Sequence, residues 1–177
     1  MTATPSFRFD DAVLSGHDVW APAPSRTAGQ RALLSEPQTR TLDVPLSKSS
    51  MKIGLLGPEP DWLYNTLQGM QHLVGLPPNW DSYGSARIQD NAIVAAMQLL
   101  ALILGPNGVN PMVVPTSEGG LQLEWHQDNL DVEIELTPVG GASAYVHDHI
   151  GDDVWEEDHM IPNAIARVAA TLARLRK

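Results

Sequence analysis

The feature that most constrains the fold is a strict alternation of apolar and polar residues between positions 121 and 136. Leu121, Leu123 and Trp125 alternate with polar residues, and after a Gln-Asp-Asn segment the alternation resumes at Leu130. A period of two places every second side chain on the same side of a strand, so each run predicts a strand with one buried and one solvated face. The short turn between the runs requires the two strands to be antiparallel.

Two further strands are expected, one on each side of this pair. Residues 112–116 precede a Ser-Glu-Gly-Gly turn, and residues 142–150 follow a Pro-Val-Gly-Gly turn. Apolar residues at helical spacing predict three helices: from about residue 58 to 75, from 87 or 90 to 104, and from 161 to 176. The sequence therefore predicts an α+β fold, a four-stranded antiparallel meander covered on one face by about three helices.

Residues 1–50 differ in composition from the rest of the chain. Five prolines interrupt every candidate periodic run in this segment. It is predicted to be an irregular N-terminal arm, either a flexible leader or a docking segment that uses its Phe and Trp residues. Residues 51–177 are predicted to form a single α+β domain, for which a hydrophobic fraction of 43% supplies enough core.

The charge of the chain is strongly segregated. Residues 88–166 contain thirteen Asp and Glu residues and no Lys or Arg, whereas residues 167–177 contain four basic residues and no acid. A one-sign field of this kind repels nucleic acid and anionic membranes, and it attracts cationic protein surfaces or metal ions. We therefore expect no direct binding to nucleic acid or membrane, and a cationic protein surface as the partner, with a hetero-complex as one form of that binding.

Other sequence features restrict the class of protein. There is no cysteine, which excludes disulfides and thiolate metal ligands. No signal-peptide pattern is visible, and the longest apolar stretch, residues 92–104, is too short to span a bilayer, so we expect a cytoplasmic protein. The Gly-x-Ser-x-Gly, phosphate-loop and dinucleotide-binding motifs are all missing. The sequence thus predicts no catalytic residue and no cofactor.

The solvated face of the predicted sheet supplies the candidate partner-binding residues. These are the polar members of the two alternating runs: Glu124, His126, Asp131, Glu133 and Glu135. A sheet face with one sign of charge favours recognition of a cationic surface. The structural alternative is an ordinary solvated surface, because exposed carboxylates are common without any function.

His147 and His149 are the candidate metal ligands. In an extended strand a His-x-His pair points both imidazoles the same way, about 7 Å apart, which suits metal ligation. The acids between residues 152 and 158 would complete a shell of oxygen ligands. No recognised metal motif is matched, and the register is open: the solvated side holds either these histidines or the alternate residues, which include Asp148.

Residues 79–84, Asn-Trp-Asp-Ser-Tyr-Gly, form the most distinctive loop. Asn and Asp close turns on their own backbone, and Gly84 accepts a left-handed conformation. Trp80, Asp81 and Tyr83 are the candidate binding residues of this loop. The two aromatic rings fit either a ligand site or a buried plug between the first two helices, and we favour the plug.

Two motifs resemble a group of small uncharacterised bacterial proteins. These proteins share an Asn-Trp-Asp-x-Tyr-Gly loop, present here at residues 79–84, and a Pro-Thr-x-x-Gly-Gly-x-x-x-Glu-Trp hairpin, present at residues 115–125. The similarity covers about residues 74–136. It implies a bacterial origin and a coherent domain, and it implies no activity.

Three functions remain open at this point. The leading interpretation is a non-catalytic, acidic protein-binding module, acting as an inhibitor or antitoxin-like partner or as an accessory subunit of a bacterial complex. The second is a metal-dependent hydrolase built around His147, His149 and nearby carboxylates. The third is a structural assembly subunit that uses the N-terminal arm.

Overall fold

The computed structural model describes residues 39–175 in full and residues 7–9 as backbone. The secondary-structure elements follow one another in this order: β1 (Phe7–Phe9), β2 (Thr39–Pro45), β3 (Ser50–Leu56), α1 (Leu63–Val74), α2 (Asp90–Ile103), β4 (Met112–Pro115), β5 (Leu121–Gln127), β6 (Leu130–Leu136), β7 (Ala142–Asp148), β8 (Asp153–Glu157) and α3 (Pro162–Leu172). The predicted α+β class with three helices is confirmed.

Strands β4 to β8 form one antiparallel sheet in chain order. The meander is therefore the predicted one, but the expected number of four strands is wrong, because β8 adds a fifth. Residues 153–157 are mostly acidic, and this hides the apolar alternation by which a strand is recognised. Backbone pairing with β7 decides their conformation, with Glu156 opposite Tyr145 and Trp155 opposite Val146.

A second antiparallel sheet has the strand order β1-β3-β2. Strand β2 lies inside the segment expected to be an irregular arm, yet it pairs with β3 over its whole length. Val44 of β2 is opposite Met51 of β3, and both side chains are buried. The domain boundary expected at residue 50 thus falls inside this hairpin. Residues 1–6 and 10–38 of the expected arm lie outside the described residues.

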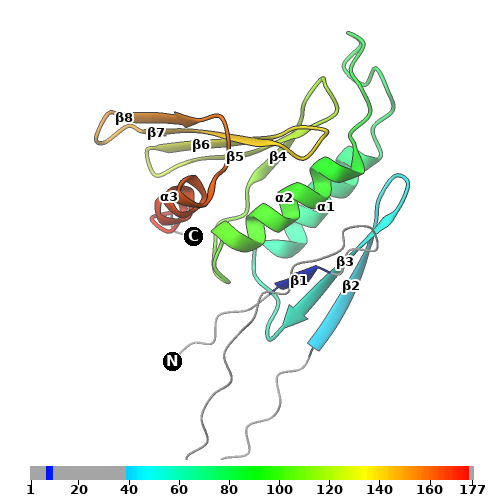
Figure 1. Cartoon of the computed structure of the whole chain (residues 1–177), viewed down its shortest axis with the longest axis horizontal. Helices are drawn as coiled ribbons and strands as arrows, with labels where there is room; N and C mark the ends of the chain where they lie inside the picture. The colour runs from blue at the N-terminus through cyan, green and yellow to red at the C-terminus, as the bar shows by residue number, and fades with distance from the viewer. Residues whose placement is uncertain (1–6, 10–38, 176–177) are drawn as a thin grey trace, which may run out of the picture.

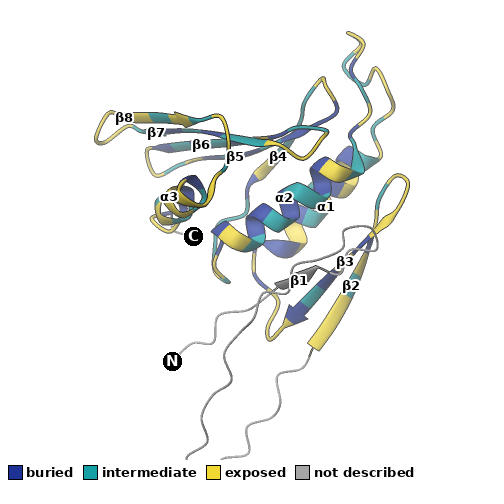
Figure 2. Cartoon of the chain, viewed as in Figure 1, coloured by how far each residue is buried: buried dark blue, intermediate teal, exposed yellow. Residues whose placement is uncertain are grey.

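The helices α1 and α2 lie between the two sheets, and α3 lies beneath the β7–β8 side of the larger sheet (Figure 1). Buried residues are frequent on the helices, and along the strands they alternate with more exposed residues (Figure 2). They form one hydrophobic cluster, to which Ile53 of the small sheet, Leu100 of α2 and Val132 of the large sheet all belong. The helix pair therefore supplies the core for both sheets.

The helix boundaries agree with the predicted ones to within a few residues. Gly105 and Pro106 follow the end of α2, and Pro162 occupies the first turn of α3, where its missing N–H costs no hydrogen bond. None of the helices in residues 39–175 combines the length and the hydropathy needed to cross a bilayer.

Two arginines, one on α3 and one just after it, form ion pairs with aspartates of the large sheet. The Arg174 guanidinium donates a hydrogen bond to Asp148 at 2.7 Å, which lowers the pKa of that carboxyl. Arg167 lies 3.7 Å from the Asp153 carboxylate and stacks over the Trp155 ring at 4.1 Å from its centroid. The basic C-terminal segment thus neutralises part of the acidic block, a pairing that the sequence did not reveal.

Asp90, the first residue of α2, joins this helix to the β2–β3 turn. Its carboxylate accepts hydrogen bonds from the backbone N–H groups of Ser47 and Lys48, both at 3.0 Å, and from the Ser49 hydroxyl at 2.9 Å. Burial acts to raise the pKa of Asp90, but these hydrogen bonds outweigh it and the pKa is lowered. The carboxylate also lies at the positive end of the helix dipole.

We expect Asp90→Asn to lower the free energy of unfolding by about 1–2 kcal/mol, because charge-assisted hydrogen bonds and the dipole interaction are lost together. Since the folded-state pKa of Asp90 is below its unfolded value, this stabilisation is present above about pH 4 and is lost as the pH falls through the folded-state pKa. Urea unfolding of both proteins at pH 7 and at progressively lower pH measures the difference. A difference that persists undiminished in acid would contradict the assignment.

Candidate functional site

The structure brings the five predicted partner-binding residues together on the side of β5 and β6 that faces away from the helices: Glu124, His126, Asp131, Glu133 and Glu135. They point outward because the alternate residues, such as Trp125 and Val132, are buried beneath the sheet. We call this side of the five-stranded sheet the outer face.

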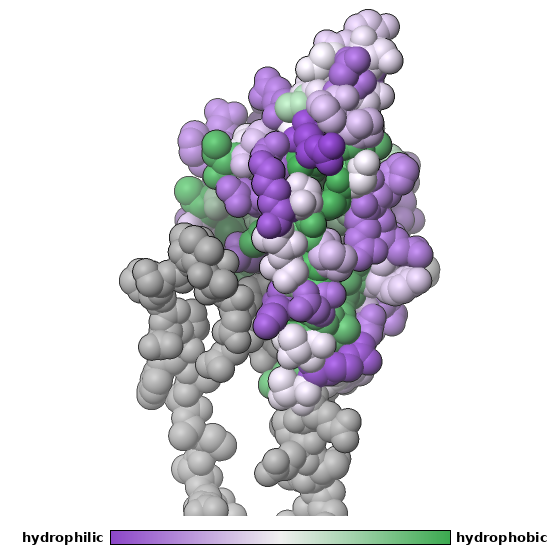
Figure 3. Space-filling model, turned by 90° about the vertical axis from the view of Figure 1, so that its right-hand side faces the viewer, coloured by the Kyte–Doolittle hydropathy of each residue, from purple (hydrophilic) through white to green (hydrophobic). Residues whose placement is uncertain are grey.

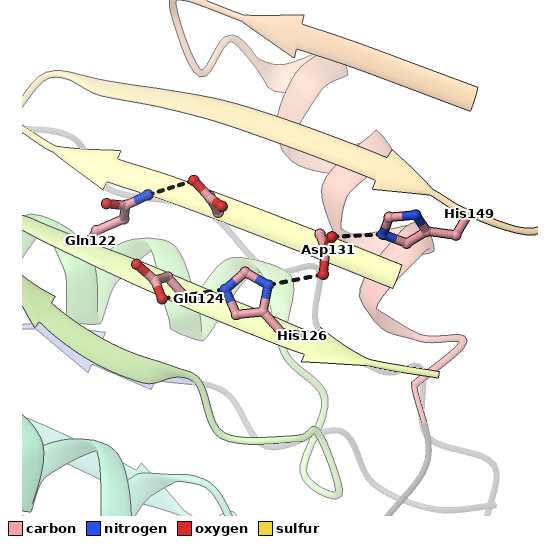
Figure 4. Close-up of polar contacts among 6 residues, drawn as sticks. Gln122, Glu124, His126, Asp131 and His149 are labelled. Carbon is pink, nitrogen blue, oxygen red and sulfur yellow. Dashed lines mark hydrogen bonds and ion pairs between the residues drawn. The ribbon is translucent and has the colours of Figure 1, made fainter. Parts of the chain in front are cut away.

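A chain of polar contacts crosses the outer face from β5 to the end of β7 (Figure 4). Glu124 lies 3.3 Å from His126 Nε2, and His126 Nδ1 lies 2.9 Å from Asp131 Oδ1. The second carboxylate oxygen of Asp131 lies 2.6 Å from His149 Nε2. The hydrogen bond to Asp131 is the main cause that raises the pKa of His126, and the hydrogen bonds from both imidazoles lower the pKa of Asp131.

The sequence left open which residues of β7 face the solvent, and the structure places His147 on the solvated side. Ala144 and Val146 are buried, and His147 lies on the outer face opposite Asp131. His149 lies one residue beyond the end of β7, and its backbone N–H donates to the Asn129 carbonyl at 2.9 Å. The two imidazole centroids are only 3.9 Å apart, so the expected extended-strand spacing of about 7 Å is wrong.

Asp131, His147 and His149 each offer one ligand atom, and these atoms lie within 4.8 Å of one another. Of the acids expected to complete a shell around the histidines, Asp152 places a carboxylate oxygen 3.6 Å from His147 Nε2, whereas Asp153 pairs with Arg167. Asp131 was predicted as a partner-binding residue, and the strand register is what adds it to the histidine pair.

A cavity of about 170 Å³ also opens on the outer face, towards β8. Its lining includes Gln122, Ser143 and Tyr145 together with five acids: Glu133, Glu135, Glu156, Glu157 and Asp158. The Gln122 amide donates to Glu133 at 2.8 Å. Sequence reasoning missed the β8 contribution to this face because it did not predict the strand. The available signal was the apolar pair Val154 and Trp155, which interrupts a run of acidic residues.

The loop of residues 79–84 lies on the connection that projects between α1 and α2, at the top of the molecule in Figure 1. Asp81 Oδ1 accepts hydrogen bonds from the N–H groups of Tyr83 at 2.8 Å and Ser85 at 3.2 Å, and the first of these is the main cause that lowers the pKa of Asp81. Asn79 Oδ1 accepts from the Gly84 N–H at 2.7 Å. The loop therefore closes on its own backbone, as predicted.

The plug interpretation of this loop is wrong for Tyr83, whose side chain is 94% exposed. Trp80 is half-buried, and its Nε1 has no hydrogen-bond partner among residues 39–175. The projecting end is mostly hydrophilic in the space-filling view (Figure 3). Nothing in this geometry gathers Trp80, Asp81 and Tyr83 around a common ligand position.

The segment that directly follows the distinctive loop is hydrogen-bonded to the β4–β5 hairpin, the second motif of the resemblance. The Ala86 N–H donates to the Ser117 carbonyl at 2.7 Å, and the Gln89 N–H donates to Gly119 at 2.9 Å. A Cβ at Gly119, whose φ is +89°, would lie 2.7 Å from the Arg87 carbonyl oxygen. This close approach explains in physical terms why a glycine occupies the hairpin turn.

Comparison of the chain with protein families, with curated proteins and with solved structures finds no match.

Proposed function

We propose that this protein is a non-catalytic, acidic protein-binding module whose outer face docks a cationic segment of a partner protein. The observation that carries the proposal is a set of carboxylates on a face that no element of residues 39–175 covers. Glu124 of β5 is directly opposite Glu133 of β6, and like charges directly opposite each other destabilise a sheet. Local rules of this kind are broken mainly where a function requires it.

The cavity beside this pair adds a concave binding position to the acidic outer face. Glu133, Glu135 and Glu156 line it, with the Tyr145 side chain among them. A guanidinium inserted there would form charge-assisted hydrogen bonds with the carboxylates and stack against the Tyr145 ring. Because this combination suits a planar, delocalised cation better than an ammonium group, we expect the partner to present arginine rather than lysine.

None of the Lys and Arg side chains within residues 39–175 forms an ion pair with a carboxylate of the outer face. Arg167 and Arg174 pair with Asp153 and Asp148 on the helix side of the sheet. No Lys or Arg occurs between residues 88 and 166. The acidic field over the outer face is therefore available to an approaching cation.

A partner of this chemistry is either a basic enzyme that the module inhibits, as an antitoxin-like protein would, or a basic subunit of a larger bacterial complex. Both uses require the same electrostatic complementarity, which raises the rate of encounter more than the lifetime of the complex.

Reversal of two charges in the cavity tests the proposal. We expect Glu133→Lys with Glu135→Lys to slow the association of an arginine-rich peptide by at least about tenfold at low salt, because steering by the acidic field is lost. The salt dependence of the association rate should flatten as well. Stopped-flow fluorescence with a labelled peptide at several salt concentrations measures both quantities.

The matched control is Asp43→Lys with Glu118→Lys, which changes the net charge equally but alters no residue of the cavity. The control should retain most of the association rate. Equal slowing by both pairs, or tighter binding of duplex DNA than of the peptide, would contradict a specific cationic-protein site on the outer face.

A further inference from the structure

We propose that Asp131, His147 and His149 bind one divalent transition-metal ion, with Zn²⁺ the best match, at the end of the outer face next to the β7–β8 turn. Two imidazoles and a carboxylate form a ligand set that suits borderline ions such as Zn²⁺, Co²⁺ and Ni²⁺. Hard ions such as Ca²⁺ and Mg²⁺ prefer shells made of oxygen alone. This inference does not rest on the proposed function: Asp131 belongs to the same outer face, but none of the three residues lines the acidic cavity.

The three ligand atoms are already gathered closely enough for one ion. They lie within 4.8 Å of one another, and a tetrahedral ion with bonds of about 2.0–2.2 Å holds its ligands about 3.4 Å apart. Strand pairing fixes the backbones of Asp131 and His147 opposite each other. The His149 side chain is 43% exposed, so its ring has room to move from its direct contact with Asp131 and admit the ion between them.

His147 supplies an independent observation in favour of a ligand. Its Nε2 atom is inaccessible to solvent and has no hydrogen-bond partner in the described part of the chain, since the Asp152 carboxylate at 3.6 Å is beyond hydrogen-bond distance. A buried polar atom left without a partner costs free energy of folding. A metal ion bound at this nitrogen would remove that cost.

The surroundings of the cluster match those of metal sites. The Asp131 oxygen that does not face His149 lies 2.9 Å from His126 Nδ1. The other nitrogen of that imidazole, Nε2, lies 3.3 Å from the Glu124 carboxylate. Groups that orient a ligand in this way are a regular part of metal centres. Asp152, whose side chain is 96% exposed, lies 3.6 Å from His147 Nε2 and is placed to serve as a fourth ligand.

Calorimetric titration of the full-length chain, prepared without a histidine tag and stripped with a chelator, tests the proposal. Zn²⁺ should bind with a stoichiometry of one ion per chain, and Ca²⁺ or Mg²⁺ should bind far more weakly. Co²⁺ should give the visible absorption bands of a tetrahedral site. His147→Ala should abolish stoichiometric binding, and His126→Gln should weaken it by about 10–100-fold by releasing the Asp131 carboxylate.

The matched control is His159→Ala, which removes an exposed histidine of the same acidic block that is not part of the cluster. It should bind Zn²⁺ as the unchanged chain does. If His147→Ala fails to fold, as judged by circular dichroism, His149→Ala decides the question because that side chain is exposed. Unchanged Zn²⁺ binding in His149→Ala, or no stoichiometric Zn²⁺ binding by the unchanged chain, would overturn the proposal whatever the result of the peptide experiment.

Discussion

Replacing Trp125 with alanine is expected to lower the free energy of unfolding by about 3–5 kcal/mol. Trp125 is 2% exposed at the centre of the core, and its indole N–H donates to the Val109 carbonyl at 2.8 Å. Truncation would leave a cavity beneath β5 and would remove the hydrogen-bond partner of that carbonyl. The sequence had already placed Trp125 on the buried side of its strand, and the structure confirms that placement.

Denaturant unfolding followed by circular dichroism measures this loss. Trp125→Phe keeps most of the ring volume but lacks the N–H group, so its effect should be smaller than that of alanine. The control is Tyr83→Ala, because a side chain that is 94% exposed should change the stability by no more than about 0.5 kcal/mol. An unchanged midpoint for Trp125→Ala would show that the tryptophan does not support the core.

Truncation within the β2–β3 hairpin is expected to have the second large effect. A chain that begins at residue 51 keeps β3 except for Ser50 but loses β2, which pairs with β3 from Thr39 to Pro45. It also loses the buried Val44, whose burial alone stabilises by about 1.5–3 kcal/mol, and the three groups that donate to Asp90. We therefore expect such a chain to be less stable by several kcal/mol than a chain that begins at residue 39.

Thermal unfolding of the two truncated chains measures the difference, and limited proteolysis reports whether β3 becomes accessible. The chain that begins at residue 39 is the matched control, because both chains lack the same segment before β2. Equal unfolding temperatures would contradict this expectation. They would show that β2 does not stabilise the domain and would support the boundary at residue 50 that composition suggested.

The sequence determined those elements whose pattern is local. The alternation in β5 and β6 identified both strands and the direction of every side chain along them, since a period of two needs no knowledge of the neighbouring strand. Helical spacing with nearby Pro and Gly located α1, α2 and α3. For the same reason Glu124, His126, Asp131, Glu133 and Glu135 were assigned to one solvated face before their contacts were known.

Tertiary structure alone decided the strands and side-chain contacts that the predicted four-stranded meander did not include. Strands β2 and β8 form through backbone pairing with the adjacent strands β3 and β7, and their own composition does not reveal them. Asp131 joins His147 and His149 because the β6–β7 register places it opposite the first histidine and the following turn carries the second back towards it. Side-chain direction is a property of one strand, whereas register and ion pairing are properties of two elements together, and only their packing sets them.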